Sequence, residues 1–337
     1  AGLVSAAGTS GDESVRHWPR LAVEPQRVLV PDGHRSVALA LAPEQRWFAS
    51  YAQSGERLKL LGGARGRSEI ETRELAVKST VLELDVSRDG RWVAVASREG
   101  AALFETAAWS SALGLLGSSV LPLAPARALS CAPSQARGIR FGAGDDLLVG
   151  HMDGTVALWN HARGELLQRF QLPGGHAHDV ELDPAGRRIA ALTRESLAVW
   201  DRASFALLHE RRGLERANAI ALDPNGRTLA LAVGEVDPAI EIYDLDAERT
   251  RVTLRGPTRE VTSLAFSPDG SRLAVASEDR LLRLYDPATG MLALSLRDHG
   301  YHLKSVVWSA DGSALASSGR DGYLLFRETE LGTSGAR

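Results

Sequence analysis

Residues 264–277 read LAFSPDGSRLAVAS, two apolar stretches joined by the tight polar turn Ser267-Pro268-Asp269-Gly270. Proline and glycine favour such a turn, and the flanking residues are typical of strands. The chain contains six further copies of this strand–turn–strand pattern. Their turns are at residues 42–45, 87–90, 142–145, 183–186, 223–226 and 309–312.

The spacing of the turns indicates the fold. Between their fourth positions, with Gly144 standing in for the drifted third copy, the intervals are 45, 54, 42, 40, 44 and 42 residues. A period of ~40–45 residues with several short strands per unit is typical of propeller blades. The second strands are almost entirely Val, Leu, Ile and Ala without strict alternation, which predicts burial on both faces. We therefore expect an all-β fold, a seven-bladed β-propeller with four-stranded antiparallel blades.

The repeat predicts one propeller domain over residues 27–331, with an N-terminal tail or linker at 1–26 and a C-terminal tail at 332–337. We expect blades at about 34–77, 78–117, 135–174, 175–213, 214–255, 256–298 and 299–331. Residues 327–337 are too polar and glycine-rich for a fourth strand in the last blade. The apolar run 27–30 is expected to supply that outer strand, which would close the ring and remove an open sheet edge.

One interval between turns is longer than the others, and the excess lies between the second and third units. Residues 117–134 contain Pro122, Pro125 and Pro133, which argue against regular structure. We expect this stretch to be an insertion that joins the outer strand of the second blade to the inner strand of the third. It would then lie on the rim of the face that propellers use for binding.

The composition argues against several classes of protein. The chain has 39 basic and 42 acidic residues among 337, which indicates neither a nucleic-acid-binding nor a membrane surface. No stretch approaches the ~18–20 apolar residues of a membrane span. A single cysteine, Cys131, excludes an intramolecular disulfide and a cysteine zinc cage.

Residues 1–14 have neither an initiator Met nor a signal-peptide pattern, so we expect a linker or processed terminus, cut from a longer protein. A cytoplasmic location is expected, with a processed exported protein as the alternative.

The sixth unit, residues 254–286, resembles the WD-repeat family closely, and the resemblance extends over about residues 27–331. Trp159-Asn160, Trp200-Asp201, Tyr243-Asp244 and Tyr285-Asp286 stand where that family places its Trp-Asp pair. The resemblance implies a structural hydrogen-bond set of His, Ser or Thr, Asp and Trp within a blade. We expect His299 and Asp321 to keep much of this set, because Gly256-Pro257 replaces the Gly-His pair in the sixth unit. The other residues expected to keep parts of it are Asp153, Trp159, Asp279 and Trp200.

Motifs for catalysis or metal binding are weak. His176-Ala177-His178-Asp179 has two histidines that would point to one side of a strand, but the sequence nominates no third ligand. Residues 87–92 resemble the Asp-box of sialidase-like propellers, yet the other six turns lack its aromatic residue, so a plain strand turn is the better interpretation. No nucleophile has the glycine-flanked elbow of a hydrolase. We expect no catalytic residue, no metal and no cofactor.

The turns between second and third strands point to the binding end of a propeller. Their mixture of charge, aromatic residues and Met is typical of protein or peptide interfaces. The partner-binding candidates on this face and in the 117–134 insertion are Tyr51, Arg98, Met152, Arg194, Glu278, Arg280, Arg320, Tyr323, Leu121 and Leu123.

We therefore expect a non-catalytic protein- or peptide-binding scaffold, monomeric on its own, with no nucleic-acid or membrane partner. It could be the sensor or regulatory domain of a larger bacterial signalling protein, such as a kinase, a caspase-like protease or a nucleotide-driven switch. The alternatives are a metal-dependent lactonase or hydrolase propeller, and a binder of a small ligand or peptide in the central channel.

Overall fold

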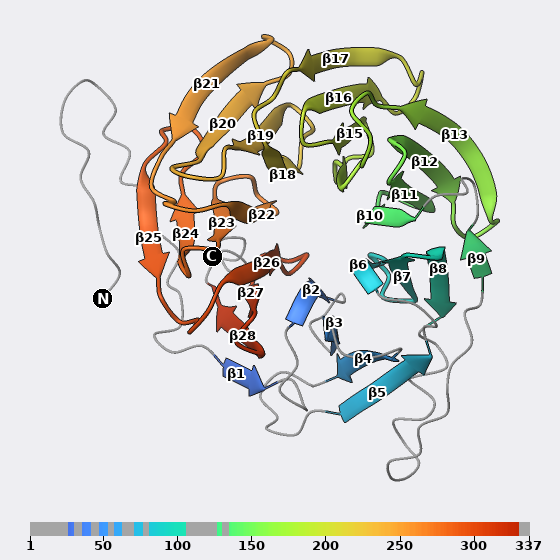
Figure 1. Ribbon diagram of the computed structural model, residues 1–337, viewed down its shortest axis with the longest axis horizontal. Coiled ribbons are helices and arrows are strands. Elements are labelled where there is room, and N and C mark those ends of the chain that lie inside the picture. Colours follow the sequence, from blue (N-terminus) through green and yellow to red (C-terminus); the bar gives the residue numbers. More distant parts are fainter. Residues whose placement is uncertain are drawn as a thin grey trace, which may run out of the picture.

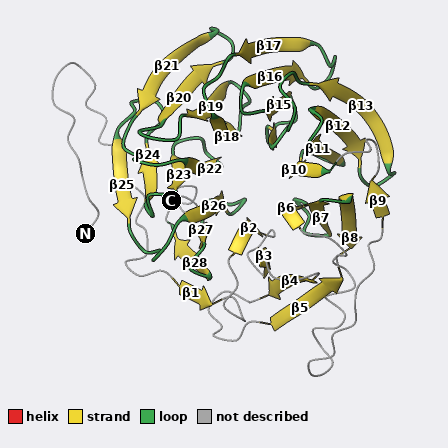
Figure 2. Cartoon of the chain, in the orientation of Figure 1, coloured by secondary structure: helices red, strands yellow, loops and turns green. Residues whose placement is uncertain are grey.

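The computed structural model describes residues 26–29, 36–41, 47–52, 57–62, 71–76, 81–105, 127–129 and 135–329. Over these ranges the chain forms four-stranded antiparallel sheets arranged around a central axis (Figure 1), and Figure 2 shows strands and loops without a helix. The strand pairing comprises seven such sheets. Side chains are described in six of them, whereas the sheet β2–β5 is described by its strands and their pairing alone. The packing of the expected seven blades can therefore be followed in six.

Each blade except the last follows the chain from its inner to its outer strand. The first blade comprises β2 (Ser36–Leu41), β3 (Trp47–Ala52), β4 (Arg57–Gly62) and β5 (Glu71–Ala76). The second and third comprise β6 (Val81–Val86), β7 (Trp92–Ser97), β8 (Gly100–Glu105), β9 (Arg127–Leu129), β10 (Ala136–Phe141), β11 (Asp146–His151), β12 (Thr155–Asn160) and β13 (Glu165–Gln171). The fourth and fifth comprise β14 (Asp179–Leu182), β15 (Arg188–Leu192), β16 (Ser196–Asp201), β17 (Leu207–Arg212), β18 (Ala217–Leu222), β19 (Thr228–Val233), β20 (Ala239–Asp244) and β21 (Arg249–Leu254). The sixth and seventh comprise β22 (Val261–Phe266), β23 (Leu273–Ser277), β24 (Leu282–Tyr285), β25 (Leu292–Leu296), β26 (Leu303–Trp308), β27 (Ala314–Gly319), β28 (Tyr323–Glu328) and β1 (Gln26–Leu29).

The second strand of a blade lies between the sheets of its neighbours. In β23 and β27 every residue is buried, and in β7, β11 and β15 only the first residue is partly exposed. The inner strands contact one another in a closed cycle, β2–β6–β10–β14–β18–β22–β26 and back to β2. Apolar residues without alternation form these second strands because both faces are covered, and each large side chain buried there contributes roughly 1.5–3 kcal/mol.

The repeated turns use two versions of one hydrogen-bond pattern. In the Ser version, the hydroxyl of Ser267 donates to Asp269 at 2.6 Å and accepts the amide of Arg272 at 2.9 Å. The turns beginning at Ser87 and Ser309 have the same bonds. For residues 87–92 this agrees with a plain strand turn.

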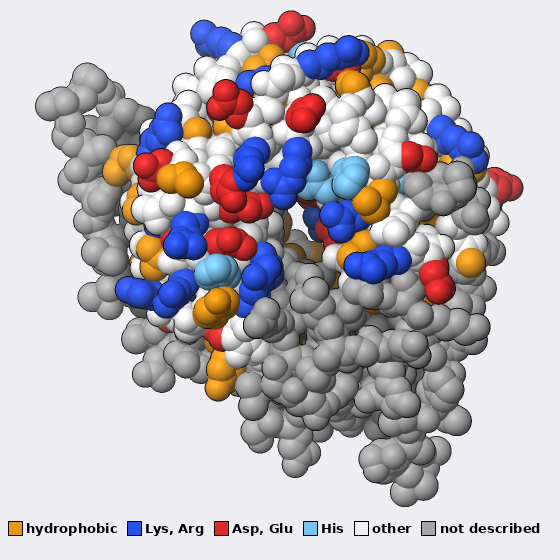
Figure 3. All heavy atoms as spheres, viewed as in Figure 1, with side chains coloured by type: hydrophobic (Ala, Val, Ile, Leu, Met, Phe, Trp, Pro, Cys, Tyr) orange, Lys and Arg blue, Asp and Glu red, His pale blue; other side chains and the backbone are white. Residues whose placement is uncertain are grey.

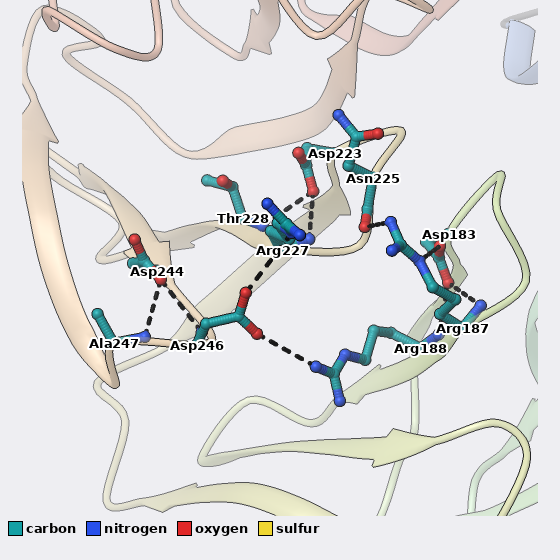
Figure 4. A network of polar contacts seen from close by, with 10 residues as sticks. All are labelled: Asp183, Arg187, Arg188, Asp223, Asn225, Arg227, Thr228, Asp244, Asp246 and Ala247. Atoms are coloured by element: carbon teal, nitrogen blue, oxygen red, sulfur yellow. Dashed lines mark hydrogen bonds and ion pairs between the residues drawn. The ribbon is translucent and has the colours of Figure 1, made fainter.

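In the Asp version, one carboxylate replaces the Ser–Asp pair. Oδ1 of Asp223 accepts the amides of Arg227 at 2.7 Å and Thr228 at 2.8 Å (Figure 4), and Asp183 does the same for its own turn. Asp246 in the fifth blade also pairs with Arg188 in the fourth, at 3.3 Å. The turns therefore join adjacent blades as well as adjacent strands.

Glycine allows the third and fourth blades to approach closely. A Cβ added at Gly150 in β11 would collide with the carbonyl oxygen of Ala177 and lie 2.9 Å from Cγ1 of Val180. At Gly138 in β10, the added Cβ would lie 3.2 Å from Cγ2 of Val180. These positions accommodate the backbone of the next blade, so a larger residue would push the two blades apart.

Strand β1 pairs antiparallel with β28, and Gln26 lies opposite Phe326. The last blade is thus completed by the N-terminal strand, which begins one residue earlier along the chain than the expected run 27–30.

The expected position of the 117–134 insertion is wrong. The fourth strand of the second blade is β9, inside that stretch, and it pairs with β8. The long connection is therefore the one between β8 and β9, within a single blade. Because the strands alternate in direction, this connection leaves the end of the ring that has the strand 1–2 turns.

Candidate functional site

The candidate binding face is formed by the turns between second and third strands and by the connections from each outer strand to the next inner strand. Arg98, Arg194, Arg280 and Arg320 are exposed on turns of this face. Its other described candidates are Met152, Glu278 and Tyr323, which are partly buried. Tyr51 is in β3 but its side chain lies outside the described residues, as do Leu121 and Leu123.

A hollow of about 430 Å³ opens between the sixth and seventh blades on this face. Arg280 and Asp321 line it from two turns between second and third strands, here called 2–3 turns. Tyr323 at the start of β28 and residues 297–300 of the β25–β26 connection complete the lining. Sequence reasoning missed Arg297 and the β25–β26 connection as part of a site, because only the 2–3 turns were taken into account. Their position just before an inner strand was the available signal.

The floor of the hollow is braced by a buried hydrogen-bond set. Nδ1 of His299 lies 3.0 Å from Oδ2 of Asp321, and Nε2 lies 2.9 Å from the hydroxyl of Ser317. Since a carboxylate only accepts, Nδ1 is the donor in the bond to Asp321. Burial alone would raise the pKa of Asp321, but the bonds from His299 and from the amides of Tyr323 and Gly300 together lower it.

The sixth blade replaces this set with an arginine. The guanidinium of Arg283 pairs with Asp279 at 2.8 Å, and both side chains are almost fully buried. Asp279 also accepts the amide of Thr258 at 3.0 Å, and the hydroxyl of Tyr285 donates to the carbonyl of Arg255 at 3.0 Å. A Tyr–carbonyl bond and an Arg–Asp pair thus occupy the space where the family pattern has Trp and His.

The remaining structural candidates are in the third and fourth blades. Asp153 accepts the amide of Thr155 at 2.9 Å. Trp159 is buried, and its indole nitrogen has no hydrogen-bond partner among the described residues. Trp200 packs against Phe170, with ring centroids 4.6 Å apart. Trp159 and Trp200 therefore contribute packing rather than the full hydrogen-bond set.

Acidic side chains on the inner strands, which the sequence places far apart, meet around one arginine. Arg140 in β10 lies 2.8 Å from Glu181 in β14 and 3.8 Å from Glu83 in β6. Asp85 accepts the amide of Phe141 at 2.8 Å, so these carboxylates also bond the inner strand of the next blade. Glu83, Asp85 and Glu181 were not among the residues singled out from the sequence. Their position on first strands, on either side of the first strand that carries Arg140, was the signal that could have grouped them.

We call Arg140 and the carboxylates of Glu83, Asp85, Asp179 and Glu181 the channel cluster. Burial dominates the ionisation of its carboxylates. It raises the pKa of Glu181 to about 8 despite the attraction of Arg140. Burial also raises the pKa values of Glu83, Asp85 and Asp179. One guanidinium cannot offset the desolvation of four carboxylates, so Glu181 keeps its proton near neutral pH.

The histidine motif does not assemble a metal site in the part of the chain that the structure describes. Nδ1 of His178 lies 3.4 Å from the carbonyl oxygen of His176. No group of three or more His, Cys, Asp or Glu residues able to hold a metal occurs within the described ranges. Those ranges also contain no helix with the length and apolar character needed to cross a membrane.

Comparison with protein families agrees with the blade architecture. A family model described as WD domain, G-beta repeat matches residues 248–286 and 290–326. Each match runs from the outer strand of one blade through three strands of the next, β21–β24 and then β25–β28. No curated protein matches the chain. Two adjacent repeats of this family within a ring of four-stranded antiparallel blades support a WD-repeat β-propeller.

Proposed function

We propose that this propeller is a non-catalytic scaffold that binds a protein or peptide on the face formed by the 2–3 turns and the outer-to-inner connections. The main support is the set of exposed arginines on this face, of which Arg280 lines the hollow beside Tyr323, in a chain that matches a family whose members typically mediate protein interactions. Arginine and tyrosine dominate the binding energy of many protein interfaces. In Figure 3 basic and acidic side chains are interspersed around the central opening, a pattern suited to a selective partner rather than to a polyanion.

The test is charge reversal on this face. The variant R98E/R194E/R280E should lose partners that wild-type protein retains after cross-linking in cells and quantitative mass spectrometry. A matched control, R91E/R163E/R249E, reverses three exposed arginines that lie on turns or at a strand start at the other end of the ring. Retention of every partner by the first variant would contradict the proposal. Stoichiometric calcium or zinc in purified protein would instead favour a propeller enzyme.

A finer form of this proposal makes the ring the sensor or regulatory domain of a larger bacterial signalling protein. Its support is the resemblance to propellers that are appended to kinases, proteases and nucleotide-driven switches. Sequencing the gene upstream of Ala1 tests it. An effector domain in frame would support the finer proposal, and a start codon directly before Ala1 would contradict it.

A further inference from the structure

We infer that the hollow between the sixth and seventh blades is a docking site for an acidic segment of a partner protein, with Arg280 as its main contact. This inference rests on the proposed function of the face and adds the chemistry and place of the partner. Three independent observations support it: the backbone conformation of Arg280, the charge balance around the hollow, and the aromatic side chains beside it.

Arg280 occupies a backbone position that suits glycine. Its φ is 73°, in the left-handed region. The equivalent turn positions in the third and seventh blades are Gly154 and Gly322, with φ of 83° and 80°. A Cβ is unfavourable in this conformation, and residues held there are concentrated at functional sites. Arg216 on the same face also has a positive φ, but it is ion-paired with Glu235. Arg280 has no carboxylate within ion-pair distance among the described residues.

The carboxylates around the hollow are already bonded to other residues of this chain. Their pairs are Asp321 with His299, Asp279 with Arg283, Asp298 with Arg327, Glu278 with Lys304, and Glu260 with Arg194. Four exposed arginines in the same region form no ion pair within the described ranges. These are Arg259, Arg280, Arg297 and Arg320. The region therefore has excess positive charge on planar guanidinium groups. Each guanidinium can donate two parallel hydrogen bonds to one carboxylate.

Aromatic side chains pack beside the guanidinium of Arg280 at the hollow. The guanidinium of Arg280 lies 5.8 Å from the ring centroid of Tyr301. Tyr301 stacks on His302, with centroids 4.5 Å apart, and remains 44% exposed. Stacking limits the conformations of Arg280, so less freedom is lost when it binds a carboxylate. An exposed tyrosine beside charged groups also offers a surface for the apolar side chains of a peptide.

The direct test measures binding of a fluorescein-labelled, glutamate-rich peptide by fluorescence anisotropy, with the same peptide carrying glutamine as the comparison. Wild type should bind the glutamate peptide, with affinity that falls as salt is added. R280G should weaken binding by about tenfold. It should also raise the thermal unfolding midpoint, because glycine relieves the left-handed strain. R280K should lie between the two, since it keeps the charge and loses the planar guanidinium. R163G, on the turn at the other end of the ring, should not change binding.

Equal binding by wild type and R280G would overturn the inference, as would equal affinity for the glutamine peptide. Tighter binding of a labelled DNA oligonucleotide than of the glutamate peptide would overturn it too. If R98E/R194E/R280E loses cellular partners while no glutamate peptide binds, the docking inference fails and the proposed function stands. If R98E/R194E/R280E retains every partner, the proposed function fails as well.

Discussion

The channel cluster predicts that the ring loses stability as the pH rises from weakly acidic to weakly alkaline values. The pKa of Glu181 is about 8 in the folded protein, against an ordinary value of 4.5. Between these two values the folded state holds a proton that the unfolded chain has released. Unfolding therefore releases a proton, and raising the pH favours the unfolded state. The contribution is fully present below the unfolded pKa and is lost by the time the pH exceeds the folded pKa.

The magnitude follows from the proton count. One proton difference changes the free energy of unfolding by at most about 1.4 kcal/mol per pH unit. Sharing of protons among Glu83, Asp179 and Glu181 reduces the part that belongs to Glu181 alone. We expect a loss of about 2 kcal/mol between about pH 5.5 and about pH 8, measured by urea unfolding followed through tryptophan fluorescence.

E181Q is the decisive variant because glutamine has the shape of the protonated acid and does not titrate. The slope of stability against pH should become shallower, and the variant should match or exceed wild type at about pH 8.5. E165Q, on the exposed outer strand β13, is the matched control and should keep the wild-type slope. A wild-type stability that stays flat or rises over this range, or an unchanged slope in E181Q, would refute the reasoning.

Two further predictions concern packing and turns. G150A should destabilise the ring by about 1–3 kcal/mol, because its Cβ meets the backbone of the next blade. G213A, where no atom lies within 4 Å but φ is 70°, should cost only about 1 kcal/mol, and equal urea midpoints for G150A and wild type would contradict the close approach. D223A should cost about 1–2 kcal/mol, since two turn amides lose their acceptor. D246A should cost less, because Asp246 is exposed and bonds Arg188 mainly at the surface, and the same urea assay orders the two variants.

The extent to which this molecule can be predicted from its sequence differs between elements. The turns and second strands follow directly, because Ser267 or Asp223 is the hydrogen-bond centre of a local turn and continuous apolar residues imply burial on both faces. Strand β9 has only three residues beside prolines, too few for any periodicity, so the insertion was misplaced. The channel cluster escaped notice because its members belong to three blades and meet only in the closed ring. Nothing in the sequence around Arg280 distinguishes its left-handed turn, since the glycine of the equivalent turns is missing there.

The pairing of β1 with β28 has a consequence for synthesis. Strand β1 is synthesised before the other strands of the ring, yet the partner of Gln26 exists only after Phe326 has been made. Until then β1 has no partner strand. The blades already synthesised form an incomplete ring, an open arc with two exposed sheet edges. Because so distant a contact is formed last, we expect ring closure to be the slow step in maturation and the nascent arc to be the species that chaperones protect.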